Sequence, residues 1–250
     1  MTEFLEVEGR RIAVERRNGG NPGLFWLGGF RSDMVGSKAT ALDALGEKRG
    51  LAVTRFDYSG HGLSGGDYRE GTISRWLAET QAVFATTSGP QVVVGSSMGG
   101  WLALLLVRAL RAAGESRVKT MVLIAPAVDM TEDLMRAKLK VRQRKALETD
   151  GFALQPNDYG DAHVITKALI EDGAKHLMFG KPIETGCPVM ILQGGKDTDV
   201  PKDHALKLVS HLLSDPVAFT LIPDGDHRLS RAEDIRVLEV AVMRGVTYED

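Results

Sequence analysis

Hydrophobic and polar residues follow two different rhythms along the chain. Near the start, the stretches FLEVEG and RIAVER alternate apolar and polar positions around Glu8-Gly9-Arg10, which predicts an antiparallel edge hairpin over residues 3–17. Further on, short continuous apolar runs are typical of strands that are buried on both faces. These runs lie at 24–28, 51–58, 91–97, 118–126, 188–195 and 218–225.

Segments long enough for helices separate these apolar runs. They lie at 37–48, 72–87, 98–113, 201–214 and 230–244. Strands that alternate with helices in this way form right-handed crossovers, which make neighbouring strands parallel. The pattern therefore predicts an α/β fold with a mostly parallel central sheet and helices on both faces.

One connection is much longer than the others. About 60 residues separate the strand that ends near Ala127 from the strand that begins at Pro188, whereas compact connections span only a few residues. Within this interval, DLMRAKLKVRQRKALE and HVITKALIEDGAKHLM have helical spacing, with a Gly/Pro/Asn-rich break at 151–160. We expect residues 1–250 to form a single domain, with a cap of two or three helices inserted at about 129–186.

Composition narrows the classes of partner. Hydrophobic residues make up 43% of the chain and charged residues 26%, and the net charge is -2, so there is no basic field that would gather nucleic acid. The single cysteine, Cys187, provides no disulfide framework, and the N-terminal sequence resembles no secretory or transit signal. The longest apolar stretch, 101–107, is too short to span a membrane. We expect a cytoplasmic protein with a small-molecule or acylated substrate; the oligomeric state stays open.

The strongest local motif is Gly95-Ser96-Ser97-Met98-Gly99. It is a G-x-S-x-G pattern at the end of the apolar strand QVVV and the start of the helical segment MGGWLALLLVRAL. A tight strand-to-helix turn of this kind holds the serine hydroxyl out at the carboxyl edge of the sheet, and small flanking residues allow the close approach. The motif makes Ser97 the candidate nucleophile of an α/β-hydrolase.

A serine hydroxyl needs an adjacent base, which a third group must orient. In α/β-hydrolases these partners follow the nucleophile in the order acid and then histidine, each after a late strand. The run PVMILQGG is followed by Asp197, and AFTLIPDG is followed by Asp226 and His227. The order predicts Asp197 as the acid and His227 as the base.

Other residues of the same types are less suitably placed. Asp199 and Asp203 lie close to Asp197, and Asp129 follows another strand, so each is an alternative acid. The remaining histidines lie on a predicted helix, in the cap, or on an early loop, namely His204, His211, His163, His176 and His61. We expect His61 and Asp57, in FDYSGHGLSGG, to form a loop rather than to act in catalysis.

The oxyanion of an acyl-transfer intermediate requires two hydrogen-bond donors. The backbone N–H of Met98 is one candidate, because it follows the nucleophile and opens a helix. The second is expected in the turn Gly28-Gly29-Phe30-Arg31, where the backbone N–H of Phe30 is the best placed and its side chain is incidental.

Several blocks of the sequence resemble the α/β-hydrolase group of mitochondrial acyl-protein thioesterases and acyl-glucuronide deacylases. They are GGFRSDMVGSKA, RFDYSGHGLSGG, VVVGSSMGGWLALL, IEDGAKH, CPVMILQGGKDTDVP and GDHRLS. The resemblance implies the α/β-hydrolase fold, Ser97 as nucleophile, Asp197 as acid and His227 as base. It also implies hydrolysis of acyl thioesters, palmitoylated cysteine or acyl-glucuronide esters, without metal or cofactor. Many superfamily members have His-Gly where this chain has Gly28-Gly29 and Gln193-Gly194. Neither position supplies a triad side chain, so the difference affects the packing of these loops and not the expected chemistry.

Two features of the cap admit two interpretations each. A basic cluster is explained by a solvated surface or by steering of anionic substrates, and consists of Arg136, Lys138, Lys140, Arg142, Arg144 and Lys145. A set of apolar side chains forms either an acyl pocket or the core of the cap, and consists of Met130, Leu134, Met135, Leu139, Leu177, Met178 and Phe179. Cys187 is expected to be a buried structural thiol.

The sequence thus predicts a serine hydrolase that cleaves acyl thioesters or carboxylic esters through an acyl-Ser97 intermediate, similar to a palmitoyl-protein thioesterase. A general carboxylesterase or lipase of small acyl esters is the alternative. A binding protein with the same fold that has lost catalysis is the rival from another class, because fold alone does not fix activity.

Overall fold

The computed structural model describes residues 2–155 and 162–249. Within these ranges, eight strands form one sheet in the order β1-β2-β4-β3-β5-β6-β9-β10. The β1–β2 and β2–β4 pairs are antiparallel, and all other neighbours in the sheet are parallel. The strands of this sheet are β1 (Glu3–Val7), β2 (Arg10–Arg17), β3 (Gly20–Leu27), β4 (Leu51–Phe56), β5 (Gln91–Ser96), β6 (Val118–Ile124), β9 (Val189–Gly194) and β10 (Val217–Ile222).

The predicted edge hairpin is formed by β1 and β2. Glu8 and Gly9 connect the two strands, and their φ angles of 47° and 77° are those of a two-residue turn that follows the natural twist of the strands. The six predicted strands correspond to β3, β4, β5, β6, β9 and β10. The prediction that all six are buried was wrong for β10, which lies at the edge of the sheet and buries only Ile222. The mostly parallel sheet predicted from the sequence is therefore confirmed.

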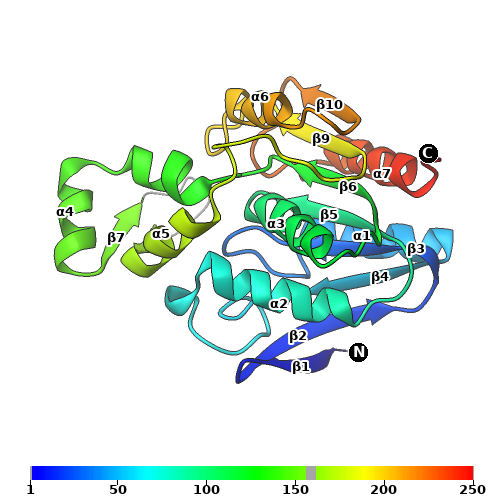
Figure 1. Cartoon of the computed structure of the whole chain (residues 1–250), viewed down its shortest axis with the longest axis horizontal. Coiled ribbons are helices and arrows are strands. Elements are labelled where there is room, and N and C mark those ends of the chain that lie inside the picture. Colours follow the sequence, from blue (N-terminus) through cyan, green and yellow to red (C-terminus); the bar gives the residue numbers. More distant parts are fainter. Residues whose placement is uncertain (1, 156–161, 250) are drawn as a thin grey trace.

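Helices cover both faces of the sheet, as predicted (Figure 1). The apolar sides of α1 and α7 pack on one face, and those of α2, α3 and α6 pack on the other. These helices are α1 (Ser37–Arg49), α2 (Ile73–Ala85), α3 (Met98–Ala112), α6 (Lys202–His211) and α7 (Ala232–Val246). Residues 101–107 of α3 are all buried. Among the described residues, no helix is long and apolar enough to cross a bilayer.

The long connection between β6 and β9 projects beyond one end of the sheet as a separate layer, green in Figure 1. It begins with two single turns, a π-helical turn and a 3₁₀ turn, and ends with another 3₁₀ turn. Its elements are η2 (Thr131–Met135), η3 (Arg136–Lys138), α4 (Val141–Thr149), β7 (Phe152–Gln155), β8 (His163–Thr166), α5 (Lys167–Gly173) and η4 (Ala174–His176). Leu147, Ala153 and Ile165 join the main hydrophobic core, which supports the proposal of a single domain with a cap at 129–186.

The cap contains a two-stranded antiparallel sheet, β7 with β8, that the sequence did not predict. Residues 163–166 are a strand, although their apolar spacing continues into α5 and predicted a helix. Val164, Ile165 and Thr166 are β-branched and favour a strand, and the Thr166 hydroxyl then accepts a hydrogen bond from Leu169 N at 3.1 Å to start α5. The predicted break at 151–160 falls partly outside the described residues.

The turn after β3, which contains Arg31, packs against the loop after β4, which contains Asp57 and His61, at the carboxyl edge of the sheet. His61 Nε2 accepts a hydrogen bond from Arg31 N at 3.0 Å, and His61 Nδ1 lies 3.1 Å from Ser59 O, so the neutral ring carries its proton on Nδ1. Arg31 has a left-handed φ of 59°, which this bond helps to hold. Asp57 accepts hydrogen bonds from Met34 N and Leu63 N, so both residues form the loop as expected.

Acidification is expected to destabilise the fold through His61. Burial lowers the pKa of His61, so the unfolded chain, with an ordinary value of about 6.5, binds the proton first. The free energy of unfolding from urea titrations should therefore fall as the pH is lowered from about 7 toward about 5. His61→Gln can accept the Arg31 N–H bond but does not titrate, and should show a smaller fall. Equal falls in both proteins would contradict this role.

A buried ion pair joins the edge hairpin to α2. Glu79 is fully buried and accepts hydrogen bonds from Arg10 Nε at 3.1 Å and Ser59 N at 2.9 Å. A buried carboxylate destabilises the folded state unless a cation and hydrogen-bond donors lie beside it, and here Arg10 and Ser59 fill these roles. The pair therefore fixes β2 against the loop that carries His61.

Removing the cation of this pair should destabilise the protein. Arg10→Met is expected to lower the free energy of unfolding by about 2 kcal/mol, because the Glu79 carboxylate then stays buried without a cation. Chemical denaturation measures the change. The double variant Arg10→Met/Glu79→Gln should recover most of the loss, whereas an Arg10→Met protein as stable as the wild type would refute the argument.

Candidate active site

The turn between β5 and α3 has a strained backbone. Ser97 has φ 54° and ψ −117°, a combination that β-carbon sterics disfavour. A β-carbon at Gly99 would lie 2.1 Å from Leu27 O, and one at Gly95 would lie 2.4 Å from Gly99 O. Glycine is therefore required on both sides of Ser97, which is the physical reason for the G-x-S-x-G pattern.

The structure brings Ser97, His227 and Asp197 together from three separate loops. His227 Nε2 lies 3.1 Å from Ser97 Oγ, and His227 Nδ1 lies 2.8 Å from Asp197 Oδ2. The Asp197 side chain is fully buried, and that of His227 is 19% exposed. A serine hydroxyl, an imidazole and a carboxylate thus form one continuous chain of hydrogen bonds.

The Asp197 carboxylate is held by its own loop. Its Oδ1 accepts hydrogen bonds from Asp199 N at 3.0 Å and Val200 N at 2.8 Å. Its Oδ2 accepts the bond to His227 and a weaker one from Gln193 Nε2 at 3.3 Å. Gln193, at the end of β9, also donates to Val200 O at 2.9 Å, and no motif in the sequence indicated either contact.

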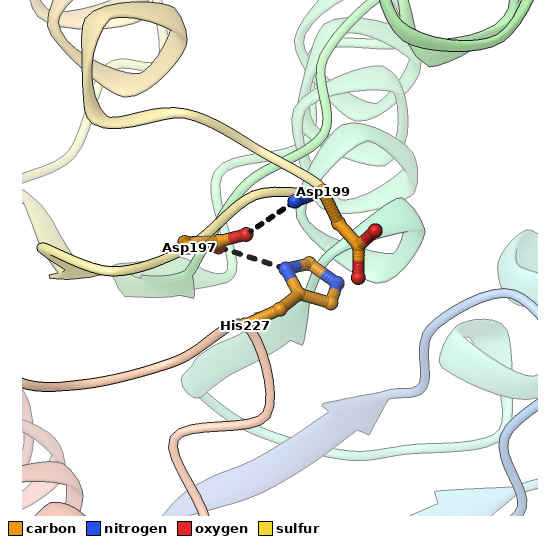
Figure 2. Close-up of side chains that lie close together, drawn as sticks. All are labelled: Asp197, Asp199 and His227. Atoms are coloured by element: carbon orange, nitrogen blue, oxygen red, sulfur yellow. Dashed lines mark hydrogen bonds and ion pairs between the residues drawn. The ribbon is translucent and has the colours of Figure 1, made fainter. Parts of the chain in front are cut away.

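Asp129 and Asp203 serve other parts of the structure, whereas Asp199 lies beside His227. Asp129 accepts hydrogen bonds from Met178 N and Phe179 N, which joins the start of the cap to its end, and burial raises the pKa of Asp129. Asp203 lies in the first turn of α6. Asp199 contributes its backbone N–H to Asp197, and its carboxylate points to the far side of the imidazole ring (Figure 2).

Asp197, Asp199 and His227 also place one potential metal ligand each within 4.8 Å of one another. A cation there would have to displace the hydrogen bonds that both Asp197 oxygens already accept, two of them drawn in Figure 2. His227 uses its two nitrogens toward Asp197 and Ser97. The donor set is therefore already occupied by the hydrogen-bond chain.

Two backbone N–H groups lie near Ser97. Met98 is the first residue of α3, so its N–H has no acceptor within the helix. A β-carbon at Gly29 would lie 3.3 Å from Ser97 Cβ, which places the turn before Phe30 against the nucleophile. The Phe30 ring packs 5.9 Å from Trp76 and 5.6 Å from His163 between ring centroids, which helps to hold the turn that carries the candidate N–H.

A cavity of about 470 Å³ opens over Ser97 and His227. One part of its wall is apolar, and the rest carries both cations and anions. The apolar lining residues are Trp26, Phe30, Ala39, Ala127, Met130, Leu134, Met135 and Val200, and the charged ones are Arg31, Asp33, Lys38, Lys138, Asp199 and Arg228. The predicted apolar set of the cap therefore serves both purposes, because Met130 and Met135 belong to the buried core and also line the cavity. Leu134 lines the cavity from a partly buried position, Leu139 and Met178 lie in the core, Phe179 packs against it, and Leu177 is exposed.

Three residues of the cavity wall were not predicted as part of the site. Lys38 Nζ donates to Arg228 O, next to His227, and burial lowers the pKa of Lys38 to about 8. Burial also lowers the pKa of His163, which faces Phe30. Lys138 was noted only as part of the basic cluster, whose six side chains are all exposed. Periodicity places all three in predicted helical segments, at 37–48 and in the cap, but it does not indicate that they face the site.

Cys187 lies at the entrance to β9 and is buried. Burial raises the pKa of its thiol to about 12. A thiol that stays protonated is a weak nucleophile, which agrees with the expected structural role.

Comparison with known proteins gives relatives with the same architecture. The model of the alpha/beta hydrolase family matches residues 19–238. The mitochondrial palmitoyl-protein thioesterase ABHD10 of Rattus norvegicus is 34% identical over 230 residues, covering 91% of this chain and 76% of that protein. The human protein of the same name is 32% identical over the same length.

Solved structures give the same result. A crystal structure of a protein from Agrobacterium vitis S4 has a TM-score of 0.95 and 46% identity, covering 98% of each chain. The alpha/beta hydrolase domain-containing protein 10 from mouse has a TM-score of 0.86 and 32% identity, covering 97% of each chain. The chain belongs to the alpha/beta hydrolase family.

Proposed function

We propose that this protein is a serine hydrolase that cleaves acyl thioesters or carboxylic esters through an acyl-Ser97 intermediate. The observation that carries the proposal is the hydrogen-bond chain from Ser97 Oγ through His227 to the buried Asp197 carboxylate. This arrangement activates a hydroxyl that is a poor nucleophile near neutral pH. The family membership and the cavity over Ser97 support the same function.

In the first half of the reaction, Ser97 Oγ attacks the carbonyl carbon of the substrate. His227 Nε2 takes the hydroxyl proton, and Asp197 stabilises the resulting imidazolium and holds its orientation. The negative charge that develops on the carbonyl oxygen is stabilised by the backbone N–H groups of Met98 and Phe30. His227 then gives the proton to the leaving thiolate or alkoxide, which departs and leaves the acyl group on Ser97.

In the second half, a water molecule attacks the acyl-Ser97 ester. His227 removes a proton from this water, and the same two N–H groups stabilise the second tetrahedral intermediate. Its collapse releases the carboxylic acid, and the proton returns from His227 to Ser97 Oγ. These steps use only side chains, backbone groups and water.

The substrate class follows from the cavity and the relatives. The Met130, Leu134 and Met135 side chains give the cavity an apolar part suited to an acyl chain. The curated relatives are named palmitoyl-protein thioesterases, which supports acylated protein or peptide substrates as well as small acyl esters. Hydrolysis of acyl glucuronides stays a prediction that comes from the sequence resemblance alone.

The competing hypotheses lead to different results. A general carboxylesterase would share the triad but prefer small oxyesters, whereas a binding protein would not turn over any ester. A panel of thioesters and oxyesters of increasing chain length separates them.

The cytoplasm stays our proposal for the location of the protein, based on its single buried cysteine. The relatives are named mitochondrial.

The nucleophile can be tested with a fluorophosphonate probe. Wild-type protein is expected to be labelled covalently, because His227 activates Ser97 Oγ, and Ser97→Ala should not be labelled. Gel fluorescence and intact-mass measurements report the adduct. Ser96→Ala is the matched control and should label normally; labelling of Ser97→Ala would refute the assignment of the nucleophile.

The acid can be tested with two matched variants. Asp197→Asn should lower kcat by about 10⁴-fold, because the amide cannot hold the required tautomer of His227. Asp199→Asn should change kcat little, since Asp199 contributes its backbone N–H rather than its carboxylate to Asp197. Steady-state ester hydrolysis measures both. The reverse ranking would make Asp199 the acid.

A further inference from the structure

A side chain of the cap forms hydrogen bonds to the loop that carries the acid. Lys138, at the end of η3, lines the cavity and extends its ammonium group to this loop. Lys138 Nζ donates hydrogen bonds to Thr198 O at 3.1 Å and to Asp199 O at 2.9 Å. About 60 residues of chain separate the partners, so this contact exists only when the cap lies over the site.

The two carbonyls belong to the peptide units that hold Asp197. The peptide that carries Thr198 O also carries Asp199 N, which donates to Asp197 Oδ1 at 3.0 Å. The next peptide carries Asp199 O and Val200 N, and Val200 N donates to the same oxygen at 2.8 Å. Both peptides are thus bonded to a cation at one end and to the candidate catalytic carboxylate at the other.

This arrangement has a physical consequence. Hydrogen bonds in series polarise one another, and a cation at a carbonyl makes the N–H of the same peptide a stronger donor. It also fixes the orientation of both peptides. The Asp197 carboxylate is therefore held more firmly at the position from which its Oδ2 orients His227.

We propose that Lys138 is a positioning residue, which couples the cap to catalysis by fixing the two peptides that hold Asp197. The proposal rests on the serine-hydrolase function above. It assigns to Lys138 a role that its five basic neighbours in the cluster do not share, because the part of the chain that the structure describes shows only Lys138 bound to this loop. Steering of anionic substrates is the competing explanation.

The experiment compares Lys138→Met, Lys138→Arg and Lys145→Met in the full chain. Lys145 is an exposed cation of α4 in the same cluster, so its variant controls for loss of positive charge from the cap. Two rates are measured: labelling of Ser97 by a small uncharged fluorophosphonate, and hydrolysis of an uncharged ester. Thermal denaturation verifies that each variant is folded, as expected for an exposed position.

Lys138→Met is expected to lower both the labelling rate and kcat by about tenfold, since a small misplacement of a triad group has an effect of this size or larger. KM should change less than about twofold. Lys138→Arg should recover most of the rate, because a guanidinium can also donate to two carbonyls. Lys145→Met should resemble the wild type. In an Asp197→Asn background, Lys138→Met should have no further effect.

Other results would overturn the proposal. Lys138→Met labelled at the wild-type rate would remove the coupling, while Ser97→Ala, still unlabelled, would leave the assignment of the nucleophile intact. Equal losses in Lys138→Met and Lys145→Met would show that the effect does not belong to Lys138 in particular, and a rise in KM alone would show that Lys138 acts on substrate binding rather than on Asp197. An undiminished effect of Lys138→Met in the Asp197→Asn background would show that Lys138 does not act through Asp197.

Discussion

The left-handed backbone of Ser97 is the constraint on which the rest of the site depends. It turns the chain sharply from β5 into α3, so that the hydroxyl leaves the sheet at its carboxyl edge and Met98 N becomes the first N–H of a helix. The conformation persists only because neighbouring backbone can approach closely, which requires Gly95 and Gly99. The same close approach places the turn after β3 against Ser97.

Carboxylates also organise loops of the molecule, three of them buried and the fourth, Asp215, half-buried. Asp57, Asp129, Asp197 and Asp215 each accept hydrogen bonds from two backbone N–H groups of a loop or a distant segment. A buried carboxylate requires such donors, and irregular loops offer N–H groups that no strand or helix satisfies. The carboxylates therefore accept hydrogen bonds from loop N–H groups that would otherwise lack acceptors, and these bonds hold the loops in position.

Asp197 differs from the other three because its second oxygen remains directed at His227. One carboxylate thus contributes both to the structure of its loop and to the proposed chemistry. The cap extends this network, since Lys138 binds the far side of the same peptides. An apolar cavity wall and a polar link to the acid loop therefore come from the same inserted segment, and substrate enclosure and triad geometry are connected through it.

The sequence by itself determined the order of strands and helices, the nucleophile turn and the proposed acid and base. These signals are local: apolar periodicity, a five-residue glycine pattern, and charged residues directly after apolar runs. They also place the cap, because an interval that long cannot be a simple connection.

The architecture of the cap and its contacts depend on packing between segments that are distant in the chain. The strand at 163–166 exists because it pairs with 152–155, and its spacing alone looked helical. The hydrogen bonds from Lys138 to the acid loop and from the Arg31 N–H to His61 join residues 30 or more positions apart. Periodicity reports which face of an element is buried, but it does not report which polar group of a distant segment lies opposite, and that depends on how the elements pack.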